Sequence, residues 1–290
     1  MITQQILSGL VAGSLYALAA LGLVLIYKTS GLVNFAQGEM AMITTFIGFT
    51  LFKMQGIGFW QAFLLALVFA AVFGVIVEMV FIRRIHKAPA ISQIILTLGL
   101  YMVFRGIAGM IWGYDPLSFP EAVSGQPLTI GSILITPNEI FIFAITILLM
   151  IIFYYVFRYT KTGLAMRAAA QNQQTSSLMG ISVGAVFSLT WVISSVLGGV
   201  AGMLIAPTTF LDPNMMGEVA IKAFAAAVLG GFSSLPGAVI GGLLIGLFEN
   251  LVAGYISAEM KTAFVFFLII LILYIKPTGL LGAKQQIKKV

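Results

Sequence analysis

Long apolar runs, separated by short polar connections, dominate the chain. A transmembrane helix needs about 20 mostly apolar residues. Eight such runs lie at about 6–27, 33–52, 60–82, 91–112, 138–157, 183–206, 236–256 and 262–276. A further apolar stretch, 219–232, is shorter and fits either a tilted crossing or a re-entrant half-helix. The pattern predicts an all-α polytopic membrane protein, with a single domain over residues 1–290 and about eight or nine transmembrane helices.

The composition removes the soluble alternatives. Of the 290 residues, 60% are hydrophobic and 8% are charged, whereas a soluble domain carries about 25% charged residues. So little polar surface excludes a soluble enzyme, a disordered chain and a nucleic-acid-binding protein. The sequence holds no cysteine, no P-loop motif for ATP and a single histidine, His86. We therefore expect no cysteine-based metal site and no catalytic centre, so the chain is predicted not to be an enzyme.

Basic residues concentrate on one set of connections, and this sets the expected orientation. Lys and Arg favour the cytoplasmic side of short loops. With the N-terminus outside and 219–232 counted as a crossing, eleven of the 15 basic residues lie inside: Lys28, Arg83, Arg84, Lys87, Arg158, Lys161, Arg167, Lys276, Lys284, Lys288 and Lys289. The charge pattern thus favours nine crossings, an outer N-terminus and a cytoplasmic C-terminal tail over about 277–290.

One inner connection, about 158–182, is much longer than the others. Its stretch Leu164–Met179 lacks Gly and Pro and contains three consecutive alanines, which predicts a short helix. Gly163 and Gly180 flank the stretch, and we expect them to act as helix breakers. The loop is therefore a candidate for contact with a cytoplasmic partner.

Polar side chains open the second apolar run. Asn34, Gln37 and Glu39 fall within six residues of each other, and the spacing puts the first two on one helix face with Glu39 turned away. An ionisable residue at a bilayer centre costs roughly 2.5–3.5 kcal/mol on insertion scales. Such a cluster is expensive for packing alone, so we expect these residues to have a role beyond fixing helix registry.

Other polar residues within apolar runs have two open interpretations. Glu218 and Lys222 are four residues apart and fit an ion pair at the start of 219–232, while Glu249 lies deep in 236–256. Lys222 and Glu249 either fix helix registry or have a function beyond packing. Glu78 is expected to pair with Arg83 at the inner interface.

Small residues suggest close helix packing and an ancient duplication. Gly-xxx-Gly spacing, which lets helix backbones approach closely in lipid, occurs at Gly9/Gly13, Gly109/Gly113, Gly198/Gly202, Gly237/Gly241 and Gly242/Gly246. These pairs fit packing within the chain or between subunits. The segments 27–32, 159–164 and 274–280 each join a tyrosine, a lysine and a glycine near a helix end. This echo fits either a duplicated ancestor or shared helix-end chemistry.

Several blocks together resemble a known family. The blocks are 31–42 (GLVNFAQGEMAM), 162–172, 179–181, 198–202, 213–217, 222–231, 237–242 and 276–280. In this order they resemble the inner-membrane permease subunits of the branched-chain amino-acid ATP-binding-cassette importers, the LivH type. The resemblance runs from residue 1 to about 282.

The resemblance implies a function that composition alone does not show. Such permeases pair with a second homologous permease and two cytoplasmic ATPases, which bind the ATP and magnesium, so this chain needs no cofactor. An extracytoplasmic binding protein delivers the amino acid, and alternating access moves it across the bacterial inner membrane. By this analogy the coupling to the ATPases involves Thr162, Gly163, Leu164, Arg167, Ala168, Asn172 and Gly180. By the same analogy we expect a set of polar residues to lie near the translocation path or to brace it: Asn34, Gln37, Glu39, Lys222 and Glu249.

Two rival functions stay open on the sequence. A permease of the same superfamily for urea, short amides or sugars would share these motifs. An ion-coupled secondary carrier would work without ATPases.

Overall fold

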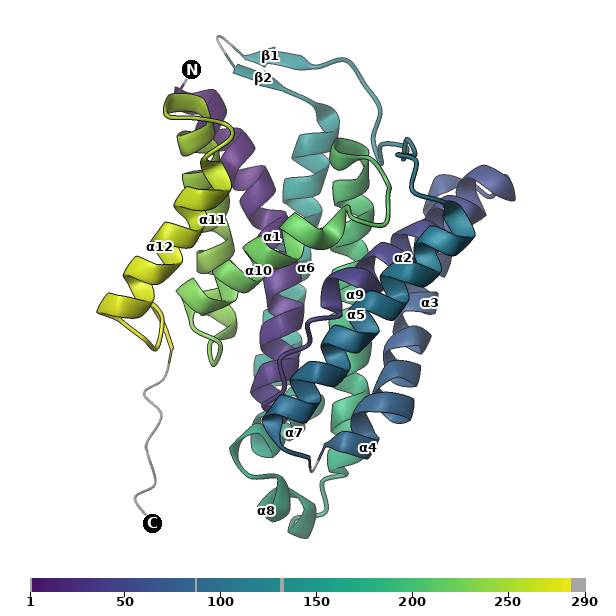
Figure 1. Cartoon of the computed structure of the whole chain (residues 1–290), viewed down its shortest axis with the longest axis vertical. Helices are drawn as coiled ribbons and strands as arrows, with labels where there is room; N and C mark the ends of the chain where they lie inside the picture. The colour runs from purple at the N-terminus through teal and green to yellow at the C-terminus, as the bar shows by residue number, and fades with distance from the viewer. Residues whose placement is uncertain (1, 87, 131–132, 283–290) are drawn as a thin grey trace.

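The computed structural model describes residues 2–86, 88–130 and 133–282, with the side chains of residues 130 and 133 excluded. Its elements, drawn in Figure 1, are α1 (Ile2–Ser30), α2 (Gln37–Phe49), η1 (Thr50–Met54), α3 (Phe59–Val77), η2 (Glu78–Ile82), α4 (Arg83–Ile85), α5 (Ala90–Trp112), β1 (Leu128–Ile130), β2 (Ile133–Ile135), α6 (Pro137–Tyr159), α7 (Lys161–Gln171), α8 (Gln173–Leu178), α9 (Val183–Thr209), α10 (Met216–Gly230), α11 (Leu235–Tyr255) and α12 (Lys261–Ile275). Here η marks a π-helical segment.

Each of the nine predicted apolar segments is helical. Six helices of the described chain are long and apolar enough to cross a membrane: Ile2–Ser30, Phe59–Ile85, Ala90–Trp112, Pro137–Tyr159, Val183–Thr209 and Leu235–Tyr255. The other three, α2, α10 and α12, have 13, 15 and 15 residues. The protein is thus a mostly helical, multi-pass membrane protein.

Helices α1 and α9 form the centre of the bundle. Over an apolar stretch of 18 residues, 83% of the residues are buried in α1 and 78% in α9. The corresponding share is 33% or less in Phe59–Ile85, α5 and α6. Helix α11 packs along α1 through small residues. A Cβ added to Gly13 would lie 2.8 Å from the Gly242 carbonyl oxygen, and one added to Gly246 would lie 2.3 Å from the Gly13 Cα. These Gly-xxx-Gly pairs therefore serve packing within one chain.

Two short helices, α2 and α10, begin part-way along the long helices rather than at their ends (Figure 1). After α1, Gly31 takes a positive φ of 75° and residues 31–36 form an irregular return. The Asn34 side-chain oxygen accepts from the Ala36 amide (3.1 Å) within this return. After α9, Phe210 has a φ of 64° and a second irregular return leads to α10. The predicted run 33–52 is therefore helical only from Gln37.

The long inner connection differs from its prediction in two ways. It holds two helices, α7 and α8, because Asn172 is extended and its Oδ1 accepts from the Thr175 amide, which caps α8. Gly163 does not break the helix: it lies inside α7, where its amide donates to the Thr160 cap (3.1 Å). Gly180 does end the segment, with a φ of 83°.

The connection between α5 and α6 contains a β-hairpin, which the all-α prediction missed. Strands β1 and β2 pair antiparallel, with Leu128 opposite Ile135 and Thr129 opposite Leu134. The Gln4 side chain ties the hairpin to α1, since its Nε2 donates to the Leu134 carbonyl (2.8 Å) and its Oε1 accepts from the Leu134 amide (2.9 Å).

Candidate functional site

A cavity of about 350 Å³ lies where α2 and α10 begin. Its wall also takes residues from α1, α5, α9 and α12, so helices from both halves of the chain close around it. The lining residues are Ala19, Leu23, Val33, Asn34, Phe35, Gln37, Gly38, Ala41, Leu98, Tyr101, Arg105, Gly198, Met216, Gly217, Ala220, Ile221, Ala223, Phe224, Phe266 and Ile269. This volume is within the ~300–1,000 Å³ typical of small-molecule sites.

Gln37 holds the start of α2 against α9. Its Nε2 donates to the Ser194 carbonyl (2.8 Å), and its Oε1 accepts from the Asn34 Nδ2 (3.2 Å) and the Ser194 hydroxyl (3.0 Å). All three residues are buried. Asn34 lies in the return before α2 and not on the predicted helix face, but it is joined to Gln37, and these hydrogen bonds fix the wall of the cavity.

Arg105 brings a positive charge to the cavity. It donates to the Tyr101 hydroxyl on its own helix and to the Asn214 side-chain oxygen in the return before α10. Its guanidinium also lies 5.5 Å from the Tyr101 ring centroid. Across the cavity, the Phe35 and Phe224 rings stack with centroids 6.0 Å apart. The site thus combines one cation with a largely aromatic and aliphatic wall.

The other three predicted path residues do not line this cavity. Glu39 is buried beside it in α2, and its Oε2 has no hydrogen-bond partner among the described residues. Lys222 is on the opposite face of α10, where its Nζ lies 2.7 Å from Glu249 Oε1 on α11. Lys222 also contacts Glu218 (3.2 Å), which confirms the predicted pair, and Tyr16 lies beneath its ammonium.

The Lys222–Glu249 pair borders a second, more polar cavity. This cavity of about 510 Å³ lies on that face of α10. Its lining includes Glu218 and Lys222 of α10 and Lys261 of α12. The side chains of Lys222 and Glu249 are only 5% and 4% exposed, so the pair is an internal link between α10 and α11. The five predicted path residues therefore divide between the two faces of α10.

The predicted coupling residues lie on α7, at the junction of α7 and α8 (Asn172) and just after α8 (Gly180), at the end of the bundle opposite the β-hairpin (Figure 1). Thr162 and Leu164 are exposed, Ala168 is half-buried, and Gly163 is packed against the end of α6. Arg167 turns back toward α6, since its Nη2 donates to the Arg158 carbonyl (3.0 Å). Beyond the Asn172 cap, Leu178 and Met179 are 88% and 79% exposed.

Comparison with known proteins decides the family. The chain matches the family described as branched-chain amino acid transport system / permease component over residues 5–273. The chain belongs to this family. Confirming the predicted resemblance, the permease is 34% identical to the high-affinity branched-chain amino acid transport system permease protein LivH of Escherichia coli K12, over 99% of this chain and 97% of that protein.

Two further relatives mark the breadth of the similarity. The permease is 32% identical to the high-affinity branched-chain amino acid transport system permease protein BraD of Pseudomonas aeruginosa, with the same coverage. It is 25% identical to the fructose import permease protein FruF of Bifidobacterium longum, over 89% of this chain and 73% of that protein. No solved structure matches the permease.

Sequence reasoning missed part of the site. Tyr101 and Arg105 are four residues apart on α5, and that spacing was a readable sign of a shared face. No local spacing could indicate the contact between Ser194 and Gln37, because the two residues are 157 positions apart in the sequence. Leu178 is an exposed leucine in a short polar helix, and its apolar side chain in a polar segment was a sign of a contact surface that the sequence analysis did not use.

Proposed function

We propose that the permease is the membrane-spanning subunit of an ATP-driven importer for branched-chain amino acids. The cavity at the start of α2 and α10 carries the proposal. Its wall is mostly apolar, and Arg105 is the one basic residue among the described residues that line it. Relatives named for branched-chain amino acid transport supply the substrate class.

The geometry suggests how such an amino acid would lie. Half-helices that begin inside a membrane present the positive ends of their dipoles to anionic substrate groups. A substrate carboxylate would therefore face Arg105 and the first turns of α2 and α10. Its branched side chain would lie against Phe35 and Phe224, whose stacked rings form an apolar surface.

The same wall argues against a sugar. Each buried sugar hydroxyl needs a hydrogen-bond partner, and leaving one without costs about 1–3 kcal/mol. The amides of Asn34 and Gln37 are already engaged with each other and with Ser194. An apolar side chain makes no such demand.

The roles of the remaining path residues follow from their contacts. Glu39, next to the cavity, would balance the charge of Arg105 during transport. Lys222 and Glu249 would brace α10 against α11 and so hold the half-helix in place. We thus assign the first to the path and the pair to its support.

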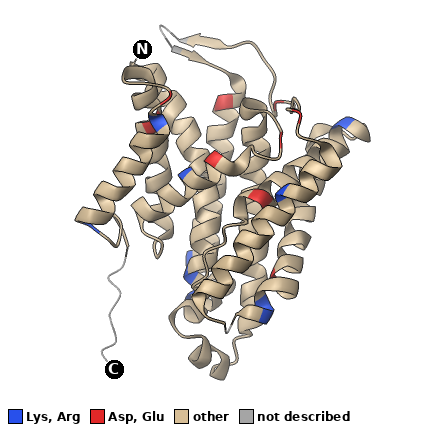
Figure 2. Ribbon diagram, in the orientation of Figure 1, with Lys and Arg blue, Asp and Glu red and all other residues tan. Residues whose placement is uncertain are grey.

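Charge distribution supports nine crossings with the N-terminus outside and the C-terminus in the cytoplasm. Figure 2 shows that most basic residues of the described chain lie at the end of the bundle that holds α4 and α7, and that most acidic residues lie toward the other end, although Glu78 lies beside Arg83. The positive-inside rule makes the first end cytoplasmic. Lys87, Lys284, Lys288 and Lys289 of this argument, and residues 283–290 of the expected tail, lie outside the described residues.

An inverted repeat would account for the paired half-helices. The same order of elements occurs twice: α1 is followed by an irregular return and α2, and α9 is followed by an irregular return and α10. Helices α1 and α9 run in opposite directions (Figure 1). Transporters with inverted repeats place substrate sites at the repeat interface near the bilayer midplane. The cavity at the start of α2 and α10 would then lie at such an interface.

The partners follow from the exposed inner helices. Leu164, Leu178 and Met179 present apolar surface beyond the membrane end of the bundle, where an ATPase would cover them. We propose that α7 and α8 dock on one of two partner ATPases, which bind ATP and magnesium. A second permease subunit and an extracytoplasmic binding protein complete a bacterial inner-membrane importer that works by alternating access.

Reconstitution tests this proposal. The permease, its co-encoded second permease, ATPases and binding protein are placed in liposomes, and uptake of leucine, isoleucine, valine, urea and fructose is measured. We expect concentrative uptake of the branched-chain amino acids only with ATP inside. Uptake by the permease alone under an ion gradient would make it a secondary carrier, and preference for urea or fructose would refute the substrate class.

A further inference from the structure

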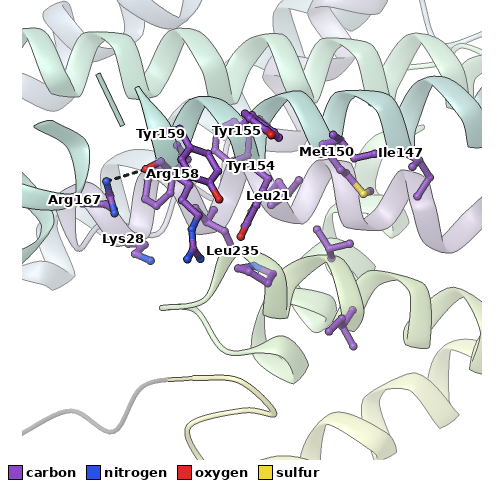
Figure 3. Close-up of a pocket in the computed structure, with 16 residues that line it drawn as sticks. Leu21, Lys28, Ile147, Met150, Tyr154, Tyr155, Arg158, Tyr159, Arg167 and Leu235 are labelled. Atoms are coloured by element: carbon purple, nitrogen blue, oxygen red, sulfur yellow. Dashed lines mark hydrogen bonds between the residues drawn. The ribbon is translucent and has the colours of Figure 1, made fainter. Parts of the chain in front are cut away.

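A groove of about 770 Å³ runs between α1, α6 and the start of α11. Figure 3 shows its charged end, where Lys28, Arg158 and Arg167 come together from three helices, α1, α6 and α7. The Arg158 side chain extends from α6 toward Leu235 at the beginning of α11. The groove is separate from the cavity proposed for the substrate, which lies beside α2, α5 and α10.

The three cations have no carboxylate to balance them. Among the described residues, no acidic side chain lines the groove, and none lies within ion-pair distance of these three residues. Instead, two of the three lie over aromatic rings: the Lys28 Nζ is 5.2 Å from the Phe157 centroid, and the Arg158 guanidinium is 5.8 Å from the Tyr154 and Tyr159 centroids. Gathering like charges at a partly desolvated site is unfavourable unless an anion enters.

The rest of the groove is apolar and extends into the membrane. Leu21 lies seven residues before Lys28 on α1, and Ile147 lies eleven before Arg158 on α6. At 1.5 Å per residue these separations are about 10 and 16 Å. Met150, Ile151, Val239 and Ile240 line the space between. A ligand that fills this groove therefore has an anionic head and a long apolar tail.

We propose that the groove binds an anionic phospholipid of the cytoplasmic leaflet, with its phosphate between Lys28, Arg158 and Arg167. Basic pockets between transmembrane helices on the cytoplasmic side are suited to such headgroups. The acyl chains lie along the apolar wall, and the tyrosines mark the interfacial level. A second permease copy is a poorer occupant, since a two-fold contact would bring the three cations against the same three cations.

The site also bears on coupling. Arg167 belongs to α7, and its guanidinium reaches the end of α6 at the groove. A bound phosphate would join α7 to α1 and α6 through one anion. Lipid composition would thus change how firmly the inner helices are held.

Native mass spectrometry of the purified permease tests the proposal. The probes are phosphatidylglycerol and phosphatidylcholine with identical acyl chains. The variant replaces all three groove cations with glutamine (K28Q/R158Q/R167Q), and a control variant removes three exposed cations elsewhere (K53Q/R84Q/K161Q). Each membrane-surface cation contributes about 1 kcal/mol toward an anionic lipid, so we expect at least a tenfold preference for phosphatidylglycerol that the groove variant loses and the control keeps.

Two results would overturn the inference: a preference unchanged in the groove variant, or an equal loss in the control. Should the triple variant fail to fold, a photoreactive benzoylphenylalanine at Ile151 or Ile240 keeps the test decisive. We expect its adduct, formed in membranes, to have the mass of a phospholipid. An adduct with a second permease chain would show that a protein covers the groove, and would also overturn it.

Discussion

The buried ion pair between α10 and α11 allows a sharp test of what Lys222 and Glu249 do. Lys222 Nζ and Glu249 Oε1 are 2.7 Å apart, and both side chains are nearly inaccessible. Removing one partner of such a pair leaves an uncompensated buried charge, which costs about 3–5 kcal/mol, whereas replacing both with apolar residues is often neutral. We therefore expect K222M and E249M each to destabilise the permease strongly, and K222M/E249M to recover most of the loss.

Neighbouring charges moderate the single variants. In K222M, Lys261 still lies 3.5 Å from Glu249. In E249M, Glu218 still lies 3.2 Å from Lys222, but its carboxylate is 70% exposed and contributes little. We therefore expect each single variant to lose about 3 kcal/mol, the lower end of the range for buried pairs.

The assay is denaturant unfolding in detergent together with leucine uptake by the reconstituted importer. The free energy of unfolding of the double variant should be at least about 3 kcal/mol higher than the value expected if the two single losses were additive. It should also transport leucine with an unchanged KM, because a brace does not touch substrate. Additive losses, or a double variant that folds well but has a strongly raised KM, would refute the assignment of the pair to support.

Three more predictions concern packing, the cavity and the coupling helices. G246L should destabilise the permease by about 1–3 kcal/mol by overpacking against α1, as measured by unfolding, whereas G99L, which meets nothing within 4 Å, should not. Q37L should raise the KM for leucine and lower stability by about 1–3 kcal/mol, since it leaves buried polar groups unpaired; a normal KM would count against the cavity. L178D should weaken co-purification of the ATPases with the permease. M54D, which changes another exposed apolar residue at the opposite end of the bundle, should not. If the ATPases still co-purify with L178D, the proposed docking of α7 and α8 on an ATPase is wrong.

Much of the fold was readable because hydropathy and small residues act locally. The nine apolar runs all became helices, and the Glu78–Arg83 pair formed at 2.7 Å as its spacing indicated. What hydropathy could not show was where a helix begins. The run 33–52 reads as continuous because Val33 and Phe35 are apolar, yet both lie in the irregular return before α2. The number of apolar residues in a run does not show whether its backbone is helical.

Helix boundaries in the inner loop failed for a related reason. Gly163 was expected to break a helix, but a cap three residues earlier, Thr160, accepts its amide and lets the helix start first. Asn172 interrupts the predicted helix because its side chain caps a new one. Capping chemistry was visible in these residues, and it outweighed the propensity of the alanines between them.

The cavity itself depended on contacts distant in sequence. Asn34 and Gln37 are hydrogen-bonded directly, as their spacing allows, but the Gln37 oxygen also accepts from Ser194 of α9, which is distant in sequence. Arg105 lines the cavity because α5 packs beside α2, and no local sequence pattern shows that contact. Polarity shows that the buried charges of Lys222 and Glu249 each need a partner, but only the fold shows that the two side chains pair with each other.

The central claim is that the cavity between α2 and α10 receives the amino acid. Because the sequence has no cysteine, a single introduced cysteine reports its own site. Ile221 lines the cavity and is 43% exposed, while Leu244 on α11 is 40% exposed and does not line it. In the assembled importer, the rate of maleimide labelling of I221C and L244C is measured with and without leucine and its binding protein. We predict that leucine slows labelling at position 221 alone, and equal rates at that position with and without leucine would contradict the account.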